Sequence, residues 1–173
     1  PADTTETIEC WELAFKNYNT PSVLALSRQN LSPVRKFYEN KNKCSLGAYE
    51  IYRSKKKVDL TIFASGSEVN LALEVSHKLA TENIYSKVIS VPCQELFFKQ
   101  TRNYKNTILK ETNFKISIEA GRSDAWEKFI GQSGMSFGVN DFGKSAPYKE
   151  IFKDFKLTVK DISNKTKKMI KKN

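Results

Sequence analysis

The stretch that decides the fold is residues 58–80, VDLTIFASGSEVNLALEVSHKLA. Its first seven residues, 58–64, are mostly apolar and rich in β-branched and aromatic side chains, which predicts a buried strand. Residues 65–67 (Ser-Gly-Ser) follow as a tight turn. From Glu68 to about Asn83 apolar residues recur at helical spacing, which predicts a helix with one apolar face. A strand that passes directly into a helix is typical of proteins with a parallel sheet.

The same alternation continues outward from this stretch in both directions. A strand over 48–52 precedes it and alternates as a strand with one exposed face does. Repeated strand–helix units predict an α/β three-layer sandwich, with a mostly parallel sheet of about five strands, one of them antiparallel, and helices on both faces. The further predicted strands cover 86–91, 115–119 and 135–139, and the further helices cover 92–97, 124–130, 145–155 and 158–170.

The N-terminal part has a different pattern. Thr4 and Thr5 offer N-cap hydroxyls for a helix that extends to about Asn17. Residues 22–27 (SVLALS) predict a short buried strand that has no neighbour in this part of the chain. We therefore expect that strand to be exposed, disordered or paired with a second copy. Residues 29–47 show little periodicity and predict a linker that ends at a glycine.

The net charge of +10 is concentrated in two short stretches. Residues 35–57 carry +6 and residues 160–173 carry +5, and the remainder is nearly neutral. A nucleic-acid binder more often presents a basic face with interleaved aromatic side chains on its folded domain. We therefore expect solvated lysines and no nucleic-acid partner. The less favoured alternative is a basic interaction protein that uses residues 160–173 to bind nucleic acid.

The composition also indicates in which cellular compartment the protein works and whether it spans a membrane. No stretch approaches the ~20 apolar residues of a membrane span, and the N-terminus lacks the pattern of a signal peptide. A first residue other than methionine suggests that the chain was cut from something longer. Cys10, Cys44 and Cys93 are odd in number and widely spaced, which argues against a disulfide framework and fits a reducing cytoplasm. We expect a cytoplasmic protein without a membrane partner.

Few residues in the chain suggest catalysis. His77 is the one histidine and lies in the middle of a predicted helix, which favours a surface residue over a general base or metal ligand. The cysteines lack CxxC spacing, and the motifs of dinucleotide-binding proteins, P-loop proteins and serine hydrolases are absent. We therefore expect no catalytic residue and no metal site in this chain.

Two groups of residues at strand ends remain open to a functional or a structural role. Gly66 and Ser67 open a helix, whose backbone amides could hold an anion. The simpler interpretation is that Gly66 turns the chain and Ser67 caps the helix. Glu119, Asp124 and Asp141 follow strands, where carboxylates could perform acid–base chemistry or cap helices. Capping is favoured for Asp124, at a helix start.

Arg28 is the sharpest single candidate. It ends the predicted strand 22–27, and a guanidinium at a strand end can hold a phosphate through two parallel hydrogen bonds. Equally, it could pair with a neighbouring acid as a structural residue. The local pattern does not separate these two roles.

A set of short motifs follows one another in a fixed order along the chain. The motifs are LALSRQNL at 24–31, GAY at 47–49, ASGSEVNLA at 64–72, VISVP at 88–92 with ELF at 95–97, EAG at 119–121 with Trp126, and FGKSAP at 142–147. This ordered set resembles the transketolase family. The resemblance covers the chain from residue 1 nearly to its end, and corresponds to the last part of a transketolase, whose chain is several times longer. It departs from the family mainly in residues 32–46.

The resemblance implies the C-terminal region of a homodimeric, cytoplasmic enzyme of the pentose phosphate pathway. Transketolases use thiamine diphosphate and a divalent metal, Mg2+ or Ca2+, to pass a two-carbon ketol unit from a ketose phosphate to an aldose phosphate. Residues 1–31 would end the pyrimidine-binding domain, 32–47 would be a linker, and 48–173 would form the C-terminal domain. Arg28 matches the arginine that binds the phosphate of the sugar phosphate.

The same resemblance places the cofactor and metal sites in domains outside this sequence. It therefore implies that the chain binds neither group, is inactive alone, and has a role in structure and subunit contacts. A stand-alone α/β module that binds a phosphorylated ligand at Gly66 and Ser67 is the alternative. A related thiamine-dependent enzyme, such as a dihydroxyacetone synthase or a 1-deoxyxylulose-phosphate synthase, is a closer rival. The Ser-Arg-Gln-Asn run at 27–30 favours transketolase over the latter.

Overall fold

The computed structural model describes residues 1–35 and 39–171, and its centre is a five-stranded sheet. The spatial order of the strands is β1-β3-β2-β4-β5. β1 runs antiparallel to β3, and the other neighbours are parallel. This confirms the predicted fold class, including the single antiparallel strand. The strands are β1 Tyr49–Arg53, β2 Leu60–Ala64, β3 Ser86–Ser90, β4 Phe114–Ile118 and β5 Met135–Phe137.

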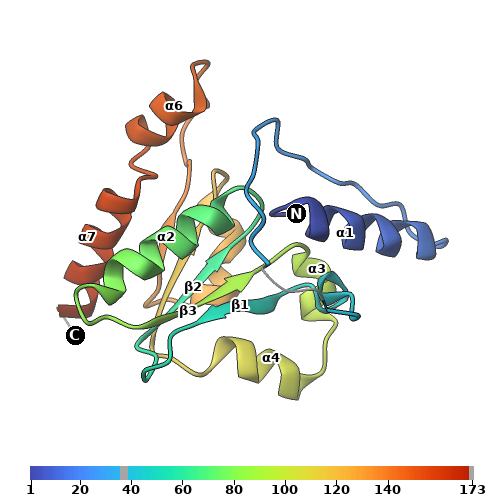
Figure 1. The fold of residues 1–173 in the computed structure, drawn as a ribbon, viewed down its shortest axis with the longest axis horizontal. Coiled ribbons are helices and arrows are strands. Elements are labelled where there is room, and N and C mark those ends of the chain that lie inside the picture. The colour runs from blue at the N-terminus through green and yellow to red at the C-terminus, as the bar shows by residue number, and fades with distance from the viewer. Residues whose placement is uncertain (36–38, 172–173) are drawn as a thin grey trace.

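Helices cover both faces of this sheet (Figure 1). Alternate residues of β2 serve the two faces, because successive side chains of a strand point in opposite directions. Ile62 packs in the core beneath α2 and α7, whereas Phe63 packs against Trp126 and Phe129 on the other face. The helices are α2 Glu68–Ala80 and α7 Val159–Lys171 on the first face, and α3 Gln94–Phe98, α4 Arg102–Leu109, the 3-10 turn η2 Ser123–Trp126 and α5 Glu127–Ile130 on the second.

The structure differs from the predicted helices at α4 and α6, and it confirms the predicted cap of α7. α4 was not predicted, because its sequence RNYKNTIL is largely polar and buries only Ile108. α6, Tyr148–Asp154, begins after Pro147, so the predicted cap at Ser145 is wrong. Thr158 does cap α7: its Oγ1 accepts from the amide of Asp161 at 3.1 Å.

Residues 1–35 contain one helix and no strand. α1, Thr4–Lys16, is capped by Asp3, whose carboxylate accepts from the amide of Glu6, so the predicted threonine cap is wrong. The predicted strand at 22–27 is also wrong, although its predicted exposure is confirmed: Val23 is 94% exposed. The segment has no strand beside it in the described part of the chain, so its backbone forms no ladder. A 3-10 turn, η1 Lys43–Leu46, then leads into the sheet.

Candidate functional site

Arg28 lies on the exposed segment that connects α1 with the linker, and Figure 1 shows this segment looping away from the sheet. Just after it, the amide of Gln29 donates to Ser27 Oγ at 3.0 Å. Among the described residues, Arg28 makes no side-chain hydrogen bond or ion pair. The structural alternative for Arg28, a pair with a neighbouring acid, therefore finds no partner in residues 1–35 and 39–171.

The carboxyl ends of β2 and β4 bring Ser65 and Glu119 together. Ala64 and Ile118 are partners in the parallel register, so the residues that follow them leave the sheet side by side. Ser65 Oγ donates to Glu119 Oε1 at 2.6 Å, and Trp126 Nε1 donates to Glu119 Oε2 at 2.7 Å. The carboxylate of Glu119 thus joins the end of β2 to η2, and both of its oxygens are occupied.

The start of α2 is dominated by a second carboxylate, that of Glu68. Its Oε1 accepts from Ser67 Oγ at 2.6 Å and its Oε2 accepts from the amide of Ala120 at 3.1 Å. Burial raises the pKa of Glu68, and the charge of Glu119 adds to that rise. Ser67 occupies the N-cap position but forms no cap hydrogen bond, because its backbone is already helical (φ −58°, ψ −26°) where a capping residue is extended.

Anion binding at Gly66 and Ser67 therefore stays a prediction, and the charges beside it oppose it. Gly66 has φ +53°, as the turn requires. The two carboxylates at this edge, Glu68 and Glu119, already use the serine hydroxyls, and they would repel an anion.

The three carboxylates predicted near strand ends do not form one site. Glu119 lies in the network with Ser65, whereas Asp124 pairs with Arg122 on the surface, Nε to Oδ1 at 3.1 Å. Asp141 accepts from the amide of Phe142, the next residue in its own loop. These contacts give the three carboxylates structural roles and provide no acid–base pair.

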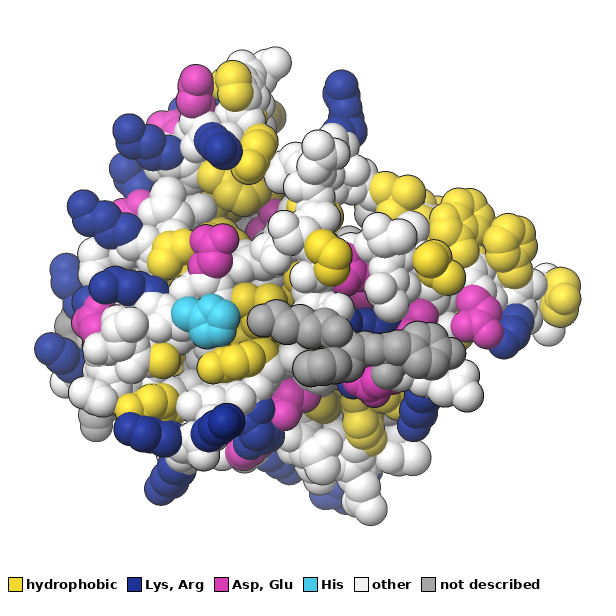
Figure 2. Space-filling view, viewed as in Figure 1, with side chains coloured by type: hydrophobic (Ala, Val, Ile, Leu, Met, Phe, Trp, Pro, Cys, Tyr) yellow, Lys and Arg dark blue, Asp and Glu magenta, His cyan; other side chains and the backbone are white. Residues whose placement is uncertain are grey.

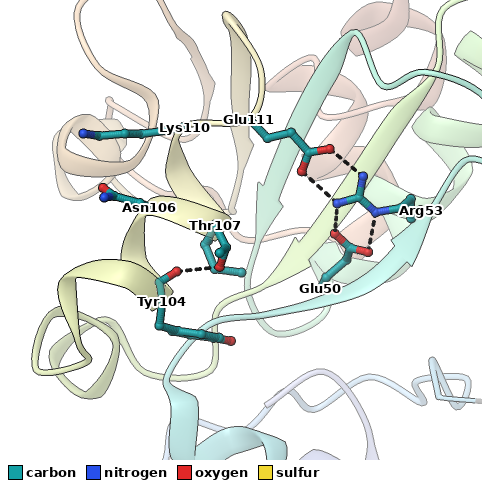
Figure 3. Close-up of a pocket in the computed structure, with 8 residues that line it drawn as sticks. Glu50, Arg53, Tyr104, Asn106, Thr107, Lys110 and Glu111 are labelled. Atoms are coloured by element: carbon teal, nitrogen blue, oxygen red, sulfur yellow. Dashed lines mark hydrogen bonds and ion pairs between the residues drawn. The ribbon is translucent and has the colours of Figure 1, made fainter.

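A surface hollow of about 700 Å3 lies at the opposite side, between β1 and α4, and was not predicted (Figure 3). Arg53 lines this hollow and lies between two carboxylates, with its Nη2 2.6 Å from Glu50 Oε2 and 2.8 Å from Glu111 Oε2. The fully buried ammonium of Lys87 also donates to Glu111 Oε2, at 2.8 Å. The charges of two cations and two anions compensate one another here. We therefore assign this cluster a structural role: it joins the sheet to the end of α4. The only sequence signal was Lys87 within an apolar strand.

We expect this cluster to make stability pH-dependent in acid. The hydrogen bonds from Arg53 lower the pKa of Glu111 to about 2. A carboxyl whose pKa is depressed by folding stabilises the native state fully above its unfolded pKa of about 4.3, and loses this effect as the pH falls toward the folded value. The stability difference between the wild type and Glu111→Gln should therefore shrink from pH 5 to about pH 2, measured by urea unfolding at each pH. Glu127→Gln, at an exposed glutamate, is the control and should show no such trend.

The described residues offer no metal site, and none of their helices is long and apolar enough to cross a membrane. No group of three or more His, Cys, Asp or Glu side chains in residues 1–35 and 39–171 could hold a metal ion. His77 is exposed, as predicted, and its ring meets the edge of Tyr52 at 5.2 Å between centroids.

Sequence reasoning also missed the inner face of α1, which is polar. The fully buried carboxylate of Glu6 accepts from the amide of Ala2 at 2.7 Å, from Tyr49 Oη at 2.6 Å and from Ser90 Oγ at 2.6 Å. Glu9 accepts from the amide of Cys44 at 3.0 Å. These contacts join α1 to the sheet domain. The sequence did contain a signal of this polar face. Glu6 and Glu9 are three residues apart, so they lie on one side of the helix, away from its large apolar side chains.

The large apolar side chains of α1 face outward. Ile8 is 64% exposed and Phe15 is 69% exposed, and Trp11 stacks on Phe15 with 5.4 Å between ring centroids. Figure 2 shows these apolar side chains gathered along the end of the molecule that α1 forms. A helix that buries its carboxylates and exposes its aromatic side chains has an apolar face that no part of residues 1–35 and 39–171 covers.

Comparison with known proteins gives one consistent family. A family model described as the transketolase-like TK C-terminal domain matches residues 47–158. The transketolase of Rhodobacter capsulatus is 39% identical over 176 aligned positions, an alignment that covers 98% of this chain and 26% of that protein. The transketolase of Bacillus subtilis is 38% identical over 175 aligned positions, which cover 99% of this chain and 26% of that protein.

Solved structures agree with this result. The transketolase of Pichia stipitis in complex with sedoheptulose-7-phosphate matches 98% of this chain and 24% of its own, with a TM-score of 0.88 and 34% identity. The chain thus spans about a quarter of the length of each of these three transketolases.

Proposed function

Because the chain belongs to the transketolase family, with its C-terminal domain at residues 47–158, we propose that it is the C-terminal region of a complete transketolase. That enzyme would transfer a two-carbon ketol unit from a ketose phosphate to an aldose phosphate in the pentose phosphate pathway, as a cytoplasmic homodimer. The observation that carries the proposal is the match of almost the whole chain to about a quarter of several transketolases. The complex of the Pichia stipitis enzyme supports a sugar phosphate as the substrate.

The two faces of α1 support the proposed domain division into 1–31, 32–47 and 48–173. The inner face is tied to the sheet domain through Glu6, whereas the outer face presents Ile8, Trp11 and Phe15 to solvent. We propose that residues 1–31 end a pyrimidine-binding domain whose remainder covers this outer face. Burial of large apolar side chains of this kind is the usual driving force of such packing.

Thiamine diphosphate and its divalent metal would be held outside this chain. A metal that binds a diphosphate is held by oxygen ligands, and the described residues contain no group of acidic side chains that could supply them. The residues present therefore do not fit the cofactor site, and we expect the 173-residue chain to have no transfer activity alone. Its own contribution would be structural, apart from one arginine.

We propose that Arg28 binds the phosphate group of the sugar phosphate. Its guanidinium is exposed and has no partner among the described residues, so it is available to an anion. Its planar fork can donate two parallel hydrogen bonds to phosphate oxygens. The flanking residues 24–31 carry a motif that resembles the family.

A chimera tests both proposals. The segment of the Bacillus subtilis transketolase that matches this chain would be replaced by residues 1–173, and the chimera should retain ketol transfer. In that chimera Arg28→Gln should lower kcat/KM for a ketose phosphate by about 10–100-fold, the value of a lost charge-assisted hydrogen bond or pair of bonds. For the unphosphorylated ketose, kcat/KM should stay unchanged. Steady-state kinetics with both substrates is the measurement.

Arg102→Gln is the matched control, since Arg102 is an exposed arginine on α4 and carries the same charge. It should leave both activities intact. Equal losses on the two substrates in Arg28→Gln would give Arg28 a structural role instead. A folded, dimeric chimera without any transfer activity would contradict the proposal that this chain is part of a transketolase.

A further inference from the structure

Cys10 and Cys44 are brought together where α1 packs on η1. The amide of Cys44 donates to Glu9 Oε2 at 3.0 Å, and Cys44 Sγ lies 3.7 Å from the carbonyl oxygen of Glu6. In an α-helix that same carbonyl accepts the amide of the residue four positions later, which is Cys10. Cys44 Sγ therefore lies against the helical turn that carries Cys10, and the two thiols are near enough to shift each other's pKa.

The two thiols differ in access and in acidity. Cys10 is partly exposed, whereas Cys44 is buried. The hydrogen bond from Cys44 lowers the pKa of Cys10, and the same bond together with burial raises the pKa of Cys44. Cys93 provides a contrast, since its thiol donates to Glu95 at 3.4 Å and burial raises its pKa. An accessible thiol of lowered pKa beside a buried thiol is the arrangement found where a redox-sensitive cysteine has a resolving partner.

We propose that Cys10 and Cys44 form a reversible disulfide when the protein meets a peroxide. The Cys10 thiolate attacks one peroxide oxygen and breaks the O–O bond. With one proton this yields a sulfenic acid on Cys10 and releases the other oxygen as water, or as an alcohol from an alkyl peroxide. The Cys44 sulfur then attacks the Cys10 sulfur, its S–H proton leaves with the hydroxyl as a second molecule of water, and the S–S bond forms. Both sulfurs are oxidised, the peroxide takes up the two electrons, and a dithiol can reduce the bond again.

The bond would link α1 covalently to the segment that enters β1. It would close a loop over residues 10–44, and a closed loop of this length restricts the unfolded chain. The oxidised protein should therefore unfold at a higher temperature than the reduced protein, by several degrees. Transient disulfides of this type are the kind that occurs in a reducing compartment. The inference does not depend on the proposed transfer activity.

The test uses the whole 173-residue chain, reduced and then treated with hydrogen peroxide at a low molar ratio. We expect the intact mass to fall by two hydrogen atoms, the protein to remain monomeric by non-reducing electrophoresis, and peptide mapping to find Cys10 joined to Cys44. Alkylation should then label one thiol, that of Cys93, and dithiothreitol should restore all three. Thermal unfolding of the two forms measures the expected rise.

Cys93→Ser is the matched control, because it removes the third thiol and leaves the pair intact. It should form the same bond, whereas Cys10→Ser should form none. Three alkylatable thiols after peroxide treatment of the wild type would overturn the proposal. So would a bond that involves Cys93, a covalent dimer, or added oxygen on Cys10 without a disulfide. These readouts come from the wild-type chain, so a variant that fails to fold does not affect them.

Discussion

Replacing Gly47 by alanine should destabilise the protein by about 2–5 kcal/mol, the sum of left-handed strain and overpacking against backbone. Gly47 has φ +74° and joins η1 to β1. A Cβ there would lie 2.1 Å from Phe97 N and 2.5 Å from the carbonyl oxygen of Cys93. Both atoms belong to the backbone at the start of α3, which cannot move aside as a side chain could. Urea unfolding of the two proteins measures the loss.

Gly131→Ala separates the two causes of that loss. Gly131 has a similar φ of +68°, but a Cβ there would meet nothing within 4 Å. It should cost only about 1–2 kcal/mol, the strain term alone. Equal costs at the two positions would show that the close approach of Gly47 to α3 does not matter, and would contradict this account of how η1 packs.

Glu6→Leu should cost about 3–5 kcal/mol, because it leaves buried donors without an acceptor. The hydroxyls of Tyr49 and Ser90 and the amide of Ala2 all donate to this carboxylate. The free energy of unfolding measures the loss. Hydrogen exchange should in addition show that the amides of α1 lose protection before those of the sheet, since these contacts join α1 to it.

Glu74→Leu is the control for this second prediction. Glu74 is an exposed glutamate in the middle of α2, so the same change there should alter stability by no more than about 0.5 kcal/mol. If Glu6→Leu were as mild as Glu74→Leu, α1 would be held by other contacts. Unchanged exchange in α1 would lead to the same conclusion.

The fold was predictable where periodicity was strong. The apolar run at 58–64 and the helical spacing after Glu68 predict β2 and α2, because burial of a strand on both faces and of one helix stripe leaves those patterns in sequence. The polar helix α4 has no such pattern in its sequence. The apolar run at 22–27 has the pattern of a strand but forms none. A strand needs a paired neighbour, and no local sequence shows whether one is present.

The candidate sites divide in the same way. Arg28 could be singled out from its motif, and the structure adds that it lacks a partner among the described residues. The hollow beside Arg53, the burial of Glu6 and the contact of Cys10 with Cys44 could not be predicted. Each joins residues that lie 34 or more positions apart, and the spacing of such pairs is decided by how the elements pack.

The sequence by itself determined the five strands of the sheet, the helices with a clear apolar stripe and the resemblance to one enzyme family. These features depend on local patterns of apolar residues and on short motifs, which are present in the sequence whether or not the chain is folded. Only the tertiary structure decided which face of α1 is buried. Hydrogen bonds to the carboxylate of Glu6 hold the polar face of this helix against the sheet, and Ile8 and Phe15 on the opposite face remain exposed. A buried carboxylate is stable only where donors from distant elements converge on it, and that convergence exists only in the folded chain.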